Sequence, residues 1–343
     1  WTVLPQYREA HFQRSPFLVF GPRVGWSFER RGNPAWTRFN DMGIRMPTPV
    51  PPRVPGEVRI LALGGPTTED ASNESGVHWP LALECLLEER GRPDVRVLNA
   101  GMSAYTTAHS LVRYQLDLVH TEPDVVLVMH NINDLTVTYY AAATGQQVDP
   151  NYLVKYGRRE YTGLVDESDV VLSRLLHFFA TRLLPPATDL LPPERWRPYD
   201  LEDGARLFER NLRWLVLAIR SSGATPVLLT MPRSDDPGVV DATRRLVNSP
   251  GVSLLPEAHA FFADFDRFND VVRSVGAAEG VPVADMARAL PTRPDLFLDV
   301  VHYSTEGSRE FGRRLADESR HWLPPSSGTV LDTKTKAPCE GVF

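Results

Sequence analysis

"VRILALGGPTTED", residues 58 to 70, is the stretch that decides the fold. It opens with a short apolar run that ends in Gly64 and Gly65, which is typical of a buried β-strand followed by a tight turn. Apolar residues at helical spacing come next, and this helical pattern ends at Gly91, a suitable residue just past the end of a helix. The sequence therefore predicts a strand, a glycine turn and a helix.

The same alternation continues along the chain. Further strands are predicted at 94–101, 124–134, 225–232 and 281–287, and further helices at 107–122, 203–223, 260–280 and 305–323. Strands that alternate with helices form a parallel sheet covered by helices on both faces. Functional groups of such a sheet gather at the carboxyl ends of its strands. Candidate functional residues are therefore expected in the loops that follow the strands.

The composition is that of a globular protein with one large α/β domain or two small ones. The chain has 343 residues, of which 42% are hydrophobic and 23% charged, which is ample material for a core. Its net charge of -6 gives no broad attraction to nucleic acid or to an anionic membrane. No apolar run reaches the roughly 18 residues of a membrane span, and no signal-peptide pattern opens the chain.

Proline clusters divide the chain into blocks. Twelve of the 30 prolines gather at 46–57, 183–198 and 323–328. The predicted organisation is an extended segment over 1–57 that packs on the core, a domain over 58–323 with an insertion at about 140–200, and a C-terminal tail over 324–343. A group of tyrosines lies in and beside the insertion. They are candidates for a lid or a sugar-stacking surface, but packing against the domain is the simplest interpretation. These are Tyr139, Tyr140, Tyr152, Tyr156 and Tyr161.

The two cysteines, Cys85 and Cys339, indicate neither a disulfide framework nor a structural zinc site, because no Cys/His cluster has metal-ligand spacing. Cys85 falls within a predicted helix and is expected to be buried there. The Gly64-Gly65 turn lacks the further glycines and the lysine of phosphate-binding loops. The sequence therefore implies no metal and no nucleotide cofactor.

Four segments at strand ends carry the polar or glycine residues that a site would need. They are 64–67, 99–101, 130–134 and 299–302. Each is a weak signal alone, but their order and their positions at strand ends are specific. The chain here resembles the SGNH/GDSL hydrolase family, in particular its branch with a Gly-Gly-Ser-Thr-Thr first block, and residues 38–47 share the resemblance. That family has a flavodoxin-like three-layer α/β/α sandwich with a parallel sheet.

The resemblance implies a role for each matched residue. His302 would be the general base that takes a proton from the nucleophile, and Asp299 would orient its imidazole and stabilise the charged form. Gly101 would offer a backbone N–H, and Asn133 its side-chain amide, to the oxyanion that develops on the substrate carbonyl. Three of the four family blocks are therefore intact at their key residues.

The first block departs from the family at Pro66, where the family has its serine nucleophile. Proline has no hydroxyl and no backbone N–H, so the attacking oxygen and one oxyanion donor are both missing. Proline is nevertheless favourable at the first position of a helix. We therefore expect the fold to be kept and the chemistry to be impaired.

Other residues of these blocks are candidates for contact with a substrate. Asn131 replaces the usual glycine of the third block and is interpreted as a conservative backbone swap, because asparagine tolerates the left-handed region. Thr67 is beside the missing serine and is a weak candidate for a replacement nucleophile. His130 is close enough to the third block to line the pocket. Ser103 is interpreted as a loop residue.

Two functions remain open. The first is an ester hydrolase acting on an acylated sugar, a glycan or another small ester, through a replacement nucleophile or through water that His302 and Asp299 activate directly. The second is a pseudoenzyme that keeps the pocket as a binding module for an acylated glycan or a protein partner. An acyltransferase would also need the serine or a substitute. Relatives with an extended N-terminal segment are often secreted or anchored, so an extracytoplasmic location is expected, with a removed leader or anchor before Trp1 left open.

Overall fold

The computed structural model describes residues 12–15, 17–25, 37–46, 48–72, 75–145, 191, 193–241 and 255–343. Its centre is a parallel sheet made of β3 (Val58–Gly64), β4 (Val95–Asn99), β5 (Val125–Met129), β6 (Thr225–Leu229) and β7 (Val283–Ala284). The strand order is β4-β3-β5-β6-β7. β4 lies on one side of β3, whereas β5, β6 and β7 lie on the other, so the strand order reverses between β3 and β5. Ligands of open α/β sheets bind at such a switch point.

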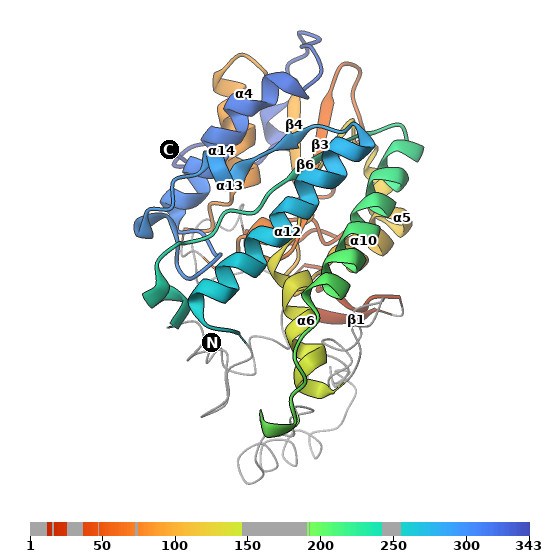
Figure 1. The fold of residues 1–343 in the computed structure, drawn as a ribbon. Coiled ribbons are helices and arrows are strands. Elements are labelled where there is room, and N and C mark those ends of the chain that lie inside the picture. The colour runs from red at the N-terminus through yellow and green to blue at the C-terminus, as the bar shows by residue number, and fades with distance from the viewer. Residues whose placement is uncertain are drawn as a thin grey trace, which may run out of the picture.

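Helices cover both faces of this sheet (Figure 1). On one side α4 (Trp79–Glu89) packs against α14 (Thr305–Glu318). On the other side α10 (Leu201–Ser221) packs against both α5 (Thr107–Leu116) and α12 (Ala258–Glu279), and α6 (Ile132–Thr144) contacts α10 and α12. The predicted three-layer α/β/α class is confirmed. None of the helices within the described ranges is long and apolar enough to cross a membrane.

Shorter elements complete the described part of the chain. They are the antiparallel pair β1 (Phe12–Ser15) and β2 (Val19–Pro22), the helices α3 (Pro66–Glu69) and α13 (Met286–Ala289), and the 3-10 turns η1 (Leu118–Thr121), η2 (Pro193–Arg195), η3 (Pro294–Leu296), η4 (Ser319–His321) and η5 (Thr333–Thr335). The predicted strand at 124–134 was too long, because Asn131 already caps helix α6. Asp134 lies in the first turn of that helix, where a negative charge is favourable.

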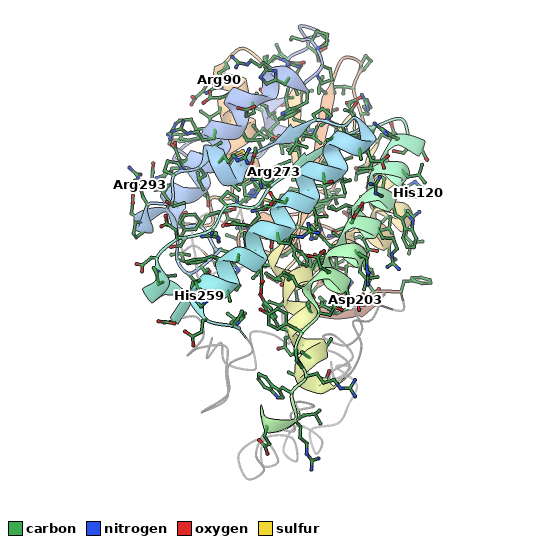
Figure 2. All side chains as sticks on the ribbon, viewed as in Figure 1. Arg90, His120, Asp203, His259, Arg273 and Arg293 are labelled. Atoms are coloured by element: carbon green, nitrogen blue, oxygen red, sulfur yellow. A yellow bond between two sulfur atoms is a disulfide. The ribbon has the colours of Figure 1, made fainter. Side chains whose placement is uncertain are left out.

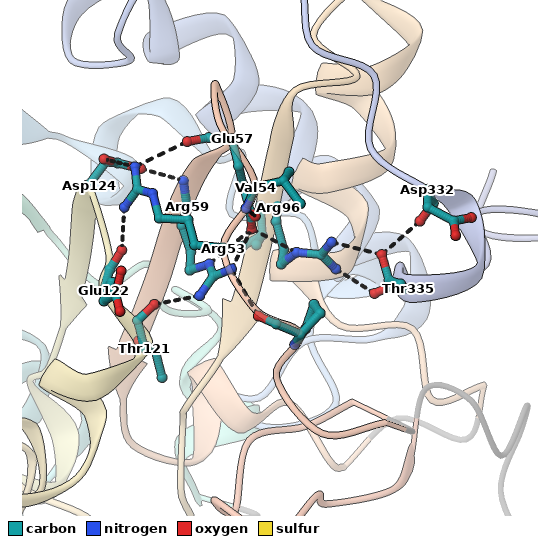
Figure 3. Close-up of polar contacts among 12 residues, drawn as sticks. Arg53, Val54, Glu57, Arg59, Arg96, Thr121, Glu122, Asp124, Asp332 and Thr335 are labelled. Carbon is teal, nitrogen blue, oxygen red and sulfur yellow. Dashed lines mark hydrogen bonds and ion pairs between the residues drawn. The ribbon is translucent and has the colours of Figure 1, made fainter.

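A buried ionic network closes the amino end of the sheet (Figure 3). Arg59 on β3 and Arg96 on β4 are direct neighbours in register, so their two positive charges need a shared counter-ion. Glu57 provides it, since its Oε1 accepts from Nε of Arg59 and from Nε of Arg96, each at 2.9 Å. Arg96 also donates to the Thr335 hydroxyl at 2.9 Å. The network therefore ties the C-terminal tail to the sheet.

The C-terminal tail is further held on helix α4, and here the cysteine prediction was wrong. Cys85 and Cys339 form a disulfide between residues separated by 254 positions, although Cys85 is buried in α4 as expected. Lys336 makes an ion pair with Glu88 at 2.5 Å. Composition could not reveal the pairing, because two distant cysteines give no spacing pattern.

Much of the predicted insertion, including Tyr152, Tyr156 and Tyr161, lies outside the described residues. At its start, Tyr139 is buried and donates to Asp264 Oδ2 at 2.8 Å. Tyr199 donates to the same oxygen at 2.9 Å. For Tyr139, packing rather than a lid is therefore the right interpretation.

Loss of the disulfide should destabilise the protein. We expect the Cys85→Ser/Cys339→Ser double variant to lose about 2–4 kcal/mol of unfolding free energy, because the bridge closes a very long loop. The measurement is chemical denaturation of both proteins, with and without a reducing agent. The reducing agent should destabilise the native chain and leave the double variant unchanged; a native chain that is equally stable when reduced would contradict the role of the bridge.

Candidate active site

The turn after β3 places Pro66 at the first position of α3, as predicted. Pro66 is half-buried, whereas its neighbours Gly65 and Thr67 are buried. The carbonyl of Pro66 accepts from the N–H of Asp70 at 2.8 Å, which closes this single helical turn. Position 66 is therefore the part of the turn that reaches the surface.

Two further loops meet this turn at very short range. A Cβ added to Gly101 would lie 2.2 Å from the backbone nitrogen of Glu69, and one added to Gly65 would lie 3.0 Å from Nδ2 of Asn133. Gly101 does not have a positive φ, so it is needed for the close approach of two backbones. The structure thus brings Gly101 and Asn133 to the turn that carries Pro66.

The two expected oxyanion donors have protein partners in this structure. The N–H of Gly101 donates to Asn99 Oδ1 at 3.0 Å, and Nδ2 of Asn133 donates to the carbonyl of Tyr105 at 2.9 Å. Ala104, which precedes Tyr105, has a φ of 66°, a conformation that costs a non-glycine residue roughly 1–2 kcal/mol. The loop that holds the Tyr105 carbonyl is therefore built with local strain.

His302 and Asp299 form a close pair in the loop before α14. Nδ1 of His302 lies 2.7 Å from Oδ2 of Asp299. The other carboxylate oxygen accepts from the backbone N–H groups of Val301 and His302, each at 2.9 Å. Asp299 therefore shapes its own turn and fixes the imidazole with the same side chain.

The pair shifts the pKa values of both partners. Burial opposes the charge on His302, but the attraction of Asp299 and the hydrogen bond to it outweigh burial and raise the pKa of His302. Burial also disfavours the charge on Asp299, yet His302 and the backbone donors lower the pKa of that carboxyl to about 2. The arrangement favours an imidazolium beside a carboxylate.

Four residues that the sequence reasoning missed support the site. Arg45 donates from its backbone to the carbonyl of Asn99 at 2.8 Å and from its guanidinium to the carbonyl of Glu69. Glu69 Oε2 accepts from the backbone N–H of Ser103 at 2.6 Å. Asp70 Oδ2 accepts from the hydroxyl of Ser308. The sequence did contain one sign of these residues, since Glu69 and Asp70 form an acidic pair directly after a predicted buried turn.

The three predicted substrate contacts, Thr67, His130 and Asn131, are all buried. The Thr67 hydroxyl is fully buried and points to the sulfur of Met231 at 3.9 Å. His130 is buried, its Nε2 lies 2.8 Å from Ser110 Oγ, and burial together with His109 lowers its pKa to about 3.

The backbone conformation of Asn131 also differs from the prediction. Its φ is -170°, which is extended backbone, so the expectation of a left-handed conformation was wrong. Its side chain instead donates to the carbonyl of Phe265 and to Asn269 Oδ1. The side chain at this position anchors helix α12.

Two other histidines of the described part lie at the surface. His120 and His259 are exposed at the surface, on different sides of the molecule (Figure 2). Within the described ranges, no group of three or more His, Cys, Asp or Glu side chains is arranged to hold a metal ion.

Comparison with known proteins gives the family of the chain. Residues 62–310 match the GDSL-like lipase/acylhydrolase family. Since this range is most of the sequence, the chain belongs to that family. No curated protein matches the chain.

Solved structures give more distant similarities. A lipase/acylhydrolase from Enterococcus faecalis is 18% identical, with 79% of this chain and 99% of that chain covered and a TM-score of 0.47. An acetyl xylan esterase from Geobacillus stearothermophilus is 17% identical, with 79% and 99% covered and a TM-score of 0.44. A GDSL-like lipase from Bacteroides thetaiotaomicron is 12% identical, with 79% and 92% covered and a TM-score of 0.45.

Removal of the Asp299 charge should lower the pKa of His302. For Asp299→Asn we expect a fall of about one pH unit or more, measured by NMR titration of the His302 ring. A matched control is Asp295→Asn in the same loop, whose carboxylate pairs with Arg293 at 3.2 Å. An unchanged pKa of His302 in folded Asp299→Asn would contradict the pairing.

The same pair gives a pH dependence of stability. The raised pKa of His302 means that its stabilising contribution is lost as the pH rises above about 6.5. The lowered pKa of Asp299 means that the contribution is lost as the pH falls from 3.8 toward about 2. The stability difference between the native chain and Asp299→Asn should therefore be greatest between about pH 4 and 6.5.

Proposed function

We propose that the loops after β3, β4 and β5, together with the His302 loop, form a carboxylic-ester hydrolase site. Its substrate is a small ester, such as an acetyl ester on a modified glycan. The observation that carries the proposal is the hydrogen-bonded pair of His302 and Asp299 at 2.7 Å. A base fixed in this way is what ester hydrolysis requires, whether the attacking group is a hydroxyl or water.

We assign Pro66 to the position of the family's nucleophile. Proline has neither a hydroxyl nor an N–H, so the route through an acyl-enzyme is closed at this residue. Thr67 does not replace it, because its hydroxyl is buried against Met231. Ser103 does not replace it either, because its hydroxyl donates to Glu69.

Direct attack by water is the route that these residues leave. The water oxygen forms a bond to the carbonyl carbon while its proton moves to His302, and Asp299 stabilises the resulting imidazolium. The amide of Asn133 donates to the oxyanion. When the tetrahedral intermediate collapses, the bond to the alcohol oxygen breaks and His302 returns the proton to that oxygen.

A binding module without turnover is the second candidate, and Pro66 is the specific observation that favours it. A ligand of this module would be an acylated glycan or a protein partner. In that case an acetylated oligosaccharide should raise the melting temperature of the native chain without being cleaved. Slow cleavage that disappears in His302→Ala would exclude this candidate.

We also propose an extracytoplasmic location. The support is the Cys85–Cys339 disulfide, since such bonds persist in oxidising compartments. Determination of the redox state of the two cysteines in freshly isolated native protein tests this proposal, and two free thiols would contradict it.

Restoration of a hydroxyl at position 66 should restore activity. With p-nitrophenyl acetate, we expect Pro66→Ser to raise kcat/KM on the order of 100-fold or more over the native chain. Pro66→Ala is the matched control, because it returns the backbone N–H without a nucleophile and should give a smaller gain. The rate of Pro66→Ser should fall as the pH drops below the pKa of His302, which is raised above 6.5, because His302 must be neutral to accept a proton.

Two results would contradict the ester-hydrolase proposal or the role of His302 in it. A folded Pro66→Ser variant with no more activity than Pro66→Ala on any acetyl ester would contradict it. Activity of Pro66→Ser that persists after His302→Ala would show that His302 is not the base.

A further inference from the structure

We propose that Asp70 is a positioning residue of the candidate active site, which holds the His302 loop against helix α3 through Ser308. Asp70 follows Glu69 at the end of α3, and Ser308 lies in the first turn of α14, six residues after His302. The inference rests on the proposed function, because it assigns a role within that same site.

Asp70 sits in an unfavourable place for a carboxylate. Its side chain is buried, and its φ of 55° lies in the left-handed region, which aspartate tolerates better than most residues. Its Oδ2 accepts from the hydroxyl of Ser308 and from the N–H of Trp79 at 3.3 Å. A buried carboxylate with directed donors of this kind fixes the relative position of the elements that supply them.

The elements that Asp70 joins are the two halves of the site. Helix α3 begins at Pro66, and α14 begins three residues after His302. A second contact lies beside the first, since the hydroxyls of Ser75 and Thr305 are 2.9 Å apart. Movement of the His302 loop away from the Pro66 turn would therefore break the Asp70–Ser308 hydrogen bond.

The charges that face Asp70 and His302 support the same role. Burial raises the pKa of Asp70 to about 7, against the Ser308 hydrogen bond and the positive charges of Arg45 and His302. His302 is in turn attracted by Asp299 first, and then by Asp70 and Glu69. Tyr303 is a further titratable neighbour of Asp70, and burial together with Asp70 raises its pKa.

The chemical consequence concerns the step in which His302 accepts a proton. The imidazolium formed in that step is stabilised by each nearby negative charge. Asp299 is hydrogen-bonded to the ring, whereas Asp70 acts on it through the attraction of its charge. Asp70 therefore holds the His302 loop in place and helps to set the proton affinity of the base without contact to the substrate.

The test is an NMR titration of His302 in the native chain, in Asp70→Asn and in Ser308→Ala. Asp70→Asn keeps an acceptor for Ser308 and Trp79 but removes the charge, so the pKa of His302 should fall by about half a pH unit or more. Ser308→Ala removes a donor that stabilises the Asp70 carboxylate, and should lower the pKa of His302 by a smaller amount.

A matched control is Asp94→Asn at the opposite end of the sheet. Asp94 is also buried, pairs with Arg92 at 2.9 Å and accepts from Ser326 Oγ at 3.2 Å. This variant should leave the pKa of His302 unchanged, although it is also expected to reduce stability. A purely structural role for Asp70 would make Asp70→Asn behave like Asp94→Asn.

The titration needs no turnover, so its result is independent of the proposed function. In the Pro66→Ser background, Asp70→Asn should lower kcat with KM unchanged; if Pro66→Ser itself is inactive, the hydrolase proposal fails while the titration still decides the role of Asp70. The inference is overturned if neither folded variant changes the pKa of His302. Ser308→Ala keeps the test available if Asp70→Asn does not fold.

Discussion

The close approach of three loops at the carboxyl end of β3 is the constraint on which the site depends. There is no room for a Cβ at Gly101, which lies against the backbone of Glu69, or for one at Gly65 without displacement of the Asn133 amide. The backbone after β4 and the side chain after β5 are therefore held against the turn of Pro66. Because protein interiors are close-packed, this contact fixes the geometry before any substrate is present.

Buried charges lock both ends of the sheet. At the amino end Glu57 is shared by Arg59 and Arg96. At the carboxyl end the Arg45 guanidinium lies beside Glu69 and Asp70, and burial lowers its pKa to about 10 against their attraction. Removal of one partner of such a buried group typically costs about 3–5 kcal/mol. The charges at the carboxyl end also surround the candidate base, so the stability of this region and the proton affinity of His302 are linked.

Local patterns in the sequence predicted the strands and the main helices, because each depends on residues that are close in the chain. The roles of Asp299 and His302 were expected only from the resemblance to the family. The same patterns could not reveal contacts between distant segments. The Cys85–Cys339 disulfide joins residues 254 positions apart, and Asp70 meets Ser308 across 238 positions. The burial of His130 and the role of Asn131 likewise depend on α5 and α12, which pack on these residues from elsewhere in the chain.

The central proposal is that the site keeps its base but has neither a nucleophile nor an oxyanion N–H at position 66. Intact-mass analysis after exposure to an alkyl fluorophosphonate tests this claim most directly, since the reagent marks an activated hydroxyl. The account predicts no adduct on the native chain, one adduct on residue 66 of Pro66→Ser, and none on Pro66→Ser/His302→Ala. An adduct on the native chain, or none on folded Pro66→Ser, would contradict it.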